Sequence, residues 1–93
     1  MNLKTQEYIC TLAECGSITE AAKRLYISQP ALSMYISNVE KSMGIQLVDR
    51  SGKNLKLTYT GELYVHKARQ MIELQDEFER EVNDIRAGIT GRI

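Results

Sequence analysis

The stretch from Glu62 to Ala87 constrains the fold most, because it contains neither proline nor glycine and is long enough for one uninterrupted helix. At about 1.5 Å per residue such a helix is roughly 40 Å long, more than a small domain can cover. Its seam residues recur four and three positions apart, the heptad spacing of a coiled coil. They are Tyr64, Ala68, Met71, Gln75, Phe78, Val82 and Ile85. We therefore predict a dimerisation helix over residues 59–87, capped by Thr60, that pairs with a second copy of the chain.

The rest of the chain is too short to cover this helix. The whole chain has 93 residues, of which 43% are hydrophobic and 26% charged, and this size indicates one small folded domain rather than two. A helix that packs only along its own domain is the alternative to self-association, but it leaves part of the seam without cover. Gln75 is the polar seam position, which lowers stability and can fix the register of paired helices.

The sequence disfavours a membrane or secreted protein, a disulfide-bonded protein, and an enzyme or metal-binding protein. No run approaches the roughly 20 apolar residues of a membrane span, and no signal-peptide pattern opens the chain, so we expect a cytoplasmic protein without a membrane partner. A bridge between Cys10 and Cys15, in and just after one predicted helix, would be strained, so we expect reduced thiols. An enzyme or a metal site is disfavoured because His66 is the only histidine and the cysteines lack C-x-x-C spacing.

Two short helices are predicted at the start of the chain. The first ends at Gly16, where glycine suits a left-handed residue, and the second begins at Ser17. Ser17 and Glu20 have the S-x-x-E spacing of a capping box. The inward face of the second helix contains two small alanines, which let a neighbouring helix approach closely. This face comprises Ile18, Ala21, Ala22 and Leu25.

A third helix and a hairpin follow the turn at residues 26–27. Ser28 is the predicted N-cap, Pro30 fits the first helical turn, and Gly44 ends the helix. Its inward face comprises Leu32, Ile36, Val39 and Met43. Alternating apolar residues then flank a polar loop at residues 49–54, which predicts a two-stranded wing. The pattern as a whole is typical of a mainly α, winged helix-turn-helix domain.

A row of short or neutral side chains lies opposite the apolar face of the third helix. The row comprises Ser28, Gln29, Pro30, Ser33, Met34, Ser37 and Asn38. The second helix of a helix-turn-helix enters the DNA major groove, where Gln29 can pair with an adenine edge and Met34 can contact a thymine methyl group. Residues 18–57 hold six basic and three acidic residues, although the whole chain is neutral. We therefore predict that double-stranded DNA is the partner of this face.

From Leu3 to about Arg86 the chain resembles the DNA-binding domain and linker helix of LysR-type transcriptional regulators. The run Ser-Gln-Pro-Ala-Leu-Ser at residues 28–33 is the most specific motif. The supporting matches are Ala13-Glu14 with Gly16-Ser17, Ala21-Ala22 through Leu25, Leu47 through Arg50, and Leu57-Thr58 with Thr60-Gly61. The resemblance covers nearly the whole chain.

This resemblance implies a winged helix-turn-helix that reads duplex DNA as a homodimer, with the long helix pairing with its mate. Residues at the positions of Gln29, Pro30 and Ser33 lie at the groove in such proteins, and basic wing residues at Arg50 and Lys53 contact phosphates or the minor groove. The chain departs from the family at Met34-Tyr35, where the family often has arginine. This departure leaves the base preference open.

The predicted organisation is a winged domain at residues 1–58 and a linker or dimerisation helix at 59–87, and the resemblance implies that residues 88–93 are the start of an effector-binding domain. No cofactor is expected in this part, whereas the resemblance implies a small-molecule effector and a possible tetramer for the full-length protein. The predicted function is sequence-specific regulation of transcription. The alternative is a protein-interaction or oligomerisation module, which would have little affinity for duplex DNA.

Overall fold

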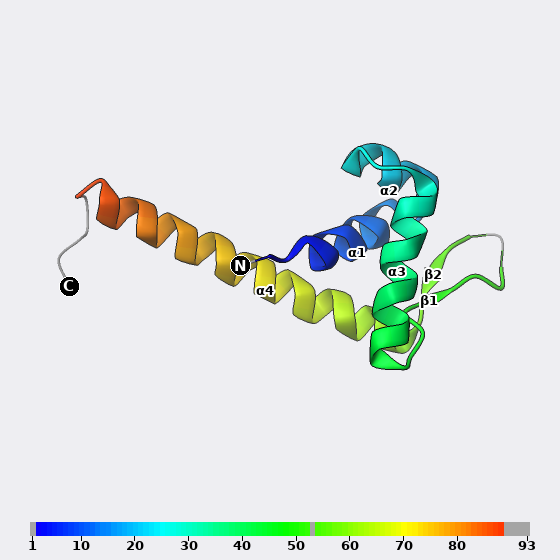
Figure 1. Ribbon diagram of the computed structural model, residues 1–93. Helices are drawn as coiled ribbons and strands as arrows, with labels where there is room; N and C mark the ends of the chain where they lie inside the picture. Colours follow the sequence, from blue (N-terminus) through cyan, green and yellow to red (C-terminus); the bar gives the residue numbers. More distant parts are fainter. Residues whose placement is uncertain (1, 53, 89–93) are drawn as a thin grey trace.

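The computed structural model describes residues 2–52 and 54–88 and shows three packed helices, a two-stranded hairpin and a long fourth helix (Figure 1). The elements are α1 (Lys4–Cys15), α2 (Ile18–Leu25), α3 (Gln29–Met43), β1 (Val48–Asp49), β2 (Lys56–Leu57) and α4 (Tyr59–Arg86). The strands are antiparallel, with Val48 opposite Leu57. The predicted fold, a mainly α winged helix-turn-helix followed by a long helix, is confirmed.

Side-chain caps fix where α2 and α3 begin. The Ser17 hydroxyl accepts a hydrogen bond from the Glu20 backbone N–H at 3.2 Å, and the Ser28 hydroxyl accepts one from the Ala31 N–H at 3.1 Å. Each cap satisfies a backbone donor that has no acceptor within its own helix. α1 ends at Gly16, whose φ of 66° is left-handed. These caps and this helix end are the ones that the sequence predicts. Of the predicted capping box only the hydroxyl half is found, because the Glu20 carboxylate instead lies 3.7 Å from Lys23 Nζ.

Two apolar clusters share α1. The first joins α1, α2 and α3 to β1, and it comprises Leu12, Ala21, Ala22, Leu32, Ile36 and Val48. The second joins α1 to the first turns of α4, and it comprises Ile9, Cys10, Leu47, Val65 and Ala68. Ile9 and Leu12 lie one turn apart on the same helix and belong to different clusters. The orientation of α4 relative to α3 is therefore fixed through α1.

The C-terminal end of α3 differs from the prediction. Leu32 and Ile36 are fully buried, and Val39 packs against the second cluster. Met43, predicted on the same inward face, is 47% exposed. The reason is that the last turn of α3 borders a groove beside α4 that the described residues leave open.

The cap of α4 is Thr58, and the predicted cap Thr60 is wrong. The Thr58 hydroxyl accepts a hydrogen bond from the Gly61 N–H at 2.9 Å and donates one to the Gln46 carbonyl at 2.7 Å. The Thr58 N–H donates to the Leu47 carbonyl at 3.0 Å. The carbonyl groups of Gln46 and Leu47, just before β1, therefore hold Thr58 in the capping position. The sequence pattern of the helix alone does not reveal these contacts.

Glu40 joins the wing to α3. Its Oε2 accepts hydrogen bonds from the backbone N–H groups of Leu47 at 2.8 Å and Val48 at 3.2 Å. These donors lie where the chain enters β1, in a partly buried position where an unpaired N–H group is costly. One carboxylate of α3 thus sets the position of the wing relative to that helix.

α4 extends well beyond the other elements (Figure 1). The whole molecule, α4 included, measures 54 × 25 × 20 Å along its principal axes. The last residue of α4 that packs against the second cluster is Ile72. Farther along the helix the large apolar side chains are open to solvent, with Leu74 64%, Phe78 58% and Ile85 52% exposed. Within one chain, the described residues provide no apolar cluster for this half of α4.

Tyr26 occupies a strained position between α2 and α3. Among the described residues it is the one non-glycine residue with a positive φ, at 58°, and its side chain is 94% exposed. Its N–H and that of Ile27 donate to the Ala22 carbonyl and end α2. A side chain in this left-handed conformation costs about 1 kcal/mol, and here it buries almost nothing in return.

We expect Tyr26→Gly to raise the melting temperature by roughly 2–6 °C, because glycine adopts this conformation without steric conflict. Thermal unfolding followed by circular dichroism measures the change. Tyr59→Gly is the matched control, since Tyr59 is 85% exposed but lies in the first turn of α4. There glycine should lower the melting temperature, because it weakens the helix. A decrease for Tyr26→Gly as well would contradict the strain argument.

Candidate nucleic-acid interface

α2 and α3 form a helix-turn-helix whose crossing is made by alanines. Ala21 and Ala22 are buried in the first cluster, where their short side chains let the two helices approach closely. The turn is closed by the Ile27 N–H, which donates to the Ala22 carbonyl at 3.0 Å. α3 is therefore held firmly on one side while its other side faces solvent.

The outer face of α3 carries the predicted base-contacting residues. Met34 is 62% exposed, and Ser33 and Ser37 are half-buried beside it. The other members of the row are exposed: Ser28, Gln29, Pro30 and Asn38. No acidic or basic residue occurs from Gln29 to Val39. This face can make hydrogen bonds and apolar contacts, but it cannot pair with a phosphate through opposite charge.

The wing places a basic side chain beside the start of α2. Arg50 is exposed directly after β1, and it lines a hollow of about 340 Å³ together with residues 16–18, Gly52, Asn54 and Leu55. The carboxylate of the neighbouring Asp49 accepts hydrogen bonds within the wing, from the Ser51 hydroxyl at 2.7 Å and from the Ser51 N–H at 2.9 Å. These hydrogen bonds hold the pKa of the Asp49 carboxyl below its ordinary value. Lys53, the other predicted wing residue, lies outside the described residues.

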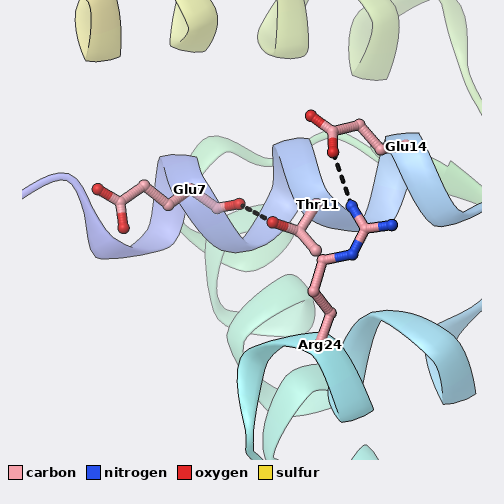
Figure 2. A network of polar contacts seen from close by, with 4 residues as sticks. All are labelled: Glu7, Thr11, Glu14 and Arg24. Atoms are coloured by element: carbon pink, nitrogen blue, oxygen red, sulfur yellow. Dashed lines mark hydrogen bonds and ion pairs between the residues drawn. The ribbon is translucent and has the colours of Figure 1, made fainter.

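Arg24, one of the basic residues of the region from 18 to 57, forms an ion pair within the domain. Arg24 of α2 approaches Glu14 of α1, with 2.8 Å between Nη1 and Oε1 (Figure 2). In the same view the Thr11 hydroxyl donates to the Glu7 carbonyl at 2.9 Å within α1. The Arg24–Glu14 pair is exposed, so its net contribution to stability is small. Its consequence is that Arg24 is drawn toward α1.

The predicted dimerisation residues fall into two groups. Tyr64 and Ala68 pack in the second cluster of their own chain, where Ala68 is 1% exposed and burial raises the pKa of Tyr64. The second group is exposed or half-buried and comprises Met71, Gln75, Phe78, Val82 and Ile85. The Gln75 Oε1 is shielded from solvent and accepts no hydrogen bond from the described residues. Contact of either group with a second chain stays a prediction.

An apolar groove of about 290 Å³ lies beside the first turns of α4. Its walls include Met43 of α3 together with Leu63 and Met71 of α4. Leu63 and Leu74 are 49% and 64% exposed, and the heptad analysis missed both. Each directly precedes a seam position, so a wider apolar stripe than the two-position seam would have identified them.

Both cysteines of the chain lie in α1. Cys10 and Cys15 are free thiols, as predicted. The Cys10 thiol is buried, which raises its pKa, and it lies 3.9 Å from the Val65 carbonyl. Residues 2–52 and 54–88 contain no group of three potential metal ligands. None of the helices over the same residues is long and apolar enough to cross a membrane.

Residues 3–62, from the start of α1 to the first turn of α4, match the model of the bacterial regulatory helix-turn-helix proteins of the lysR family. The chain belongs to the lysR family. The matched region of this LysR-type domain contains the helix-turn-helix, the wing and the cap of α4. The resemblance drawn from the Ser-Gln-Pro-Ala-Leu-Ser motif is therefore confirmed.

The relatives of the LysR-type domain are transcriptional regulators. A protein described as a probable RuBisCO transcriptional regulator of Chlorokybus atmophyticus is 42% identical over 82 residues, which are 88% of this chain and 26% of that protein. An uncharacterized HTH-type transcriptional regulator in the ibpB–leuC intergenic region of Azotobacter vinelandii is 30% identical over 93 residues, 100% of this chain and 65% of that protein. The chain thus spans about a quarter of the first relative and less than two thirds of the second.

Solved structures show the same fold as this LysR-type domain. The BenM DNA-binding domain in complex with catB site 1 DNA has a TM-score of 0.94 and 31% identity over 100% of both chains. The CbnR DNA-binding domain in complex with DNA has a TM-score of 0.82 and 30% identity over 89% of this chain and 95% of that chain. The agreement includes the winged helix-turn-helix on which the predicted site residues lie.

Proposed function

We propose that this LysR-type domain binds duplex DNA sequence-specifically as part of a transcriptional regulator, with α3 in the major groove. The observation that carries the proposal is the exposed, uncharged N-terminal face of α3, presented by a buried alanine crossing. The major groove is about 12 Å wide and admits one helix. Gln29 and Ser33 then present donors and acceptors to base edges. That the BenM and CbnR domains are solved as DNA complexes supports the same role here.

The wing contributes the charge that the outer face of α3 lacks. Arg50 is exposed, and its position after β1 is fixed through the hydrogen bond that the Val48 N–H donates to the Glu40 carboxylate. We assign Arg50, and Lys53 in the same loop, to the DNA backbone or the minor groove. Phosphate contacts of this kind position a protein on DNA without reading sequence. The uncharged α3 is therefore assigned to reading base edges, and the basic wing is assigned to contacting phosphates.

A homodimer formed through α4 completes the proposed binding unit. Leu74, Phe78 and Ile85 are exposed apolar residues of α4. They lie beyond Ile72, the last residue of this helix that packs against its own domain. Gln75 lies among them with a shielded amide oxygen that a second chain can supply with a donor. Symmetric pairing would place two copies of α3 on two DNA half-sites.

The charges of α4 favour an antiparallel pair. Residues 59–72 contain two basic residues and one acidic residue, whereas residues 73–86 contain six acidic and two basic residues. Parallel pairing would bring the two acidic halves together. Antiparallel pairing instead places each acidic half beside the basic half of its partner, and it brings Phe78 and Ile85 toward the groove at Met43 and Leu63.

The whole protein is proposed to be a non-enzymatic regulator that acts in the bacterial cytoplasm. The chain spans only 26% of the RuBisCO regulator relative. We place the start of an effector-binding domain at residues 88–93, of which 89–93 lie outside the described residues. A small-molecule effector and a tetramer belong to that full-length protein, and no cofactor is assigned to this part. To test this extension, cells that contain the full-length regulator are grown with candidate effectors, and the activity of its target promoter is measured.

The proposal is tested by a salt titration of duplex binding with a site selected from random sequences. We expect the affinity to fall at least about a hundredfold between roughly 50 and 200 mM salt, because bound phosphates release counterions. Gln29→Glu should weaken binding to the selected site roughly 100-fold at constant salt, since a carboxylate faces acceptor edges and phosphates. Fluorescence anisotropy with a labelled duplex measures both effects.

Gln70→Glu is the matched control, because it makes the same chemical change at an exposed position of α4. It should keep nearly full affinity for the selected site. Equal losses for the two variants would remove α3 from the interface and leave only a general charge effect. Absence of salt-dependent duplex binding by the unaltered protein would favour the alternative, a protein-interaction module.

A further inference from the structure

Met34 is an exposed apolar side chain that the fold does not use. It is 62% exposed, and it belongs to neither apolar cluster. The adjacent Tyr35 points the other way, since its ring packs edge-on against Tyr8 at 4.8 Å and Lys4 lies over both rings. Met34 is therefore the large apolar side chain of the outward row in the described part of α3.

The surroundings of Met34 on α3 are neutral. Pro30 precedes it by one turn, Ser37 and Asn38 follow by one turn, and no charged residue occurs between positions 29 and 39. No charged side chain on this part of the helix therefore draws a phosphate toward Met34. The position is also early in the recognition helix, about 7.5 Å along the axis from Gln29, where such helices approach base edges.

The chemistry of the major groove offers one good match for this side chain. Base edges there present hydrogen-bond acceptors and donors, and the C5 methyl group of thymine is the apolar feature. A thioether has no donor and is a weak acceptor, so covering a polar edge with it would leave that edge without a partner. Its flexible, polarizable chain adapts well to a methyl group.

We infer that Met34 recognises a pyrimidine C5 methyl group in the major groove. This inference rests on the proposed DNA binding and deepens it. Thymine and 5-methylcytosine carry the methyl group at the same ring position, so either base can supply it. The domain then distinguishes methylated from unmethylated pyrimidines at this position, whichever hydrogen bonds the base makes elsewhere.

The experiment starts from a duplex selected by the unaltered protein. Each thymine of one half-site is replaced in turn by uracil, which removes only the methyl group. At the position that responds, affinities are then compared for thymine, uracil, 5-methylcytosine and cytosine, each opposite its complementary purine. We expect the methyl group to improve affinity roughly 3- to 5-fold within each pair, which corresponds to burial of one methyl group.

The same four duplexes are measured with Met34→Ala and Met34→Leu. Alanine should bring both methylated-to-unmethylated ratios to about one, whereas leucine, which remains large and apolar, should keep the preference. Equal melting temperatures for the three proteins would establish that only the interface has changed, as the exposure of Met34 predicts.

Two results would overturn the inference while DNA binding itself holds. One is that no thymine responds to uracil; the other is that Met34→Ala keeps the full methyl preference, which would assign the methyl group to another side chain. Failure of the unaltered protein to bind any selected duplex is a different outcome, because it would overturn the proposed function and the inference together.

Discussion

Gly61→Ala is expected to destabilise the domain by at least about 3 kcal/mol, which lowers the melting temperature by roughly 12–20 °C. A Cβ atom at Gly61 would lie 2.0 Å from the Leu47 carbonyl oxygen and 2.9 Å from its carbon. These atoms are backbone, so a change of side-chain rotamer cannot relieve the overlap. The oxygen also accepts the Thr58 N–H at 3.0 Å, and moving it away would break that hydrogen bond.

Gly52→Ala is the matched control for this prediction. A Cβ atom at Gly52 meets nothing within 4 Å, so the same added methyl group should change the melting temperature little. Thermal unfolding of both variants at one protein concentration is the measurement, since any self-association makes the melting temperature depend on concentration. A Gly61→Ala protein as stable as Gly52→Ala would show that α4 does not approach Leu47 this closely.

The double change of Phe78 and Val82 to lysine is expected to convert a dimer into a monomer. Phe78 is 58% exposed and Val82 half-buried in a half of α4 that its own domain does not cover. The change removes apolar burial of about 2 kcal/mol for each large side chain and introduces charges that must be desolvated at the interface. Sedimentation equilibrium measures the molecular mass, and circular dichroism checks that the winged domain remains folded.

DNA affinity gives a second measure of the same variant. A monomer loses the high effective concentration with which a dimer meets its second half-site, so affinity for a two-half-site duplex should fall far more than affinity for one half-site. Phe78→Leu with Val82→Ile is the control, because it keeps both positions apolar and should remain dimeric. A stable dimer with undiminished duplex affinity after the lysine changes would exclude this part of α4 as the interface.

Features set by neighbouring residues were predictable from the sequence. Ser17 and Ser28 cap their helices as expected, because a cap needs only a hydroxyl and an N–H group three residues away. Gly16 and Gly44 end α1 and α3 in the left-handed conformation. The exposed row on α3 follows from the helical period in the same way, since it lies opposite the buried Leu32.

Features that depend on a distant segment were not predictable in this way. Tyr64 and Ala68 fit the heptad seam, yet they pack within their own chain because α1 lies against the start of α4. Met43 fits an inward helical face, yet the groove beside α4 leaves it exposed. Periodicity identifies a face of a helix, but it does not say which segment covers that face or where the cover ends.

The sequence by itself determined the order of the elements, the helix-turn-helix, the neutral face of α3 and the family, because each follows from spacing over a few residues or from a continuous motif. Only the tertiary structure decided that Thr58 caps α4, that Glu40 positions the wing and that Gly61 must lack a side chain. These three features share one physical cause. The segment around Leu47 passes close to α3 and α4, and its backbone groups require partners and space from residues elsewhere in the chain.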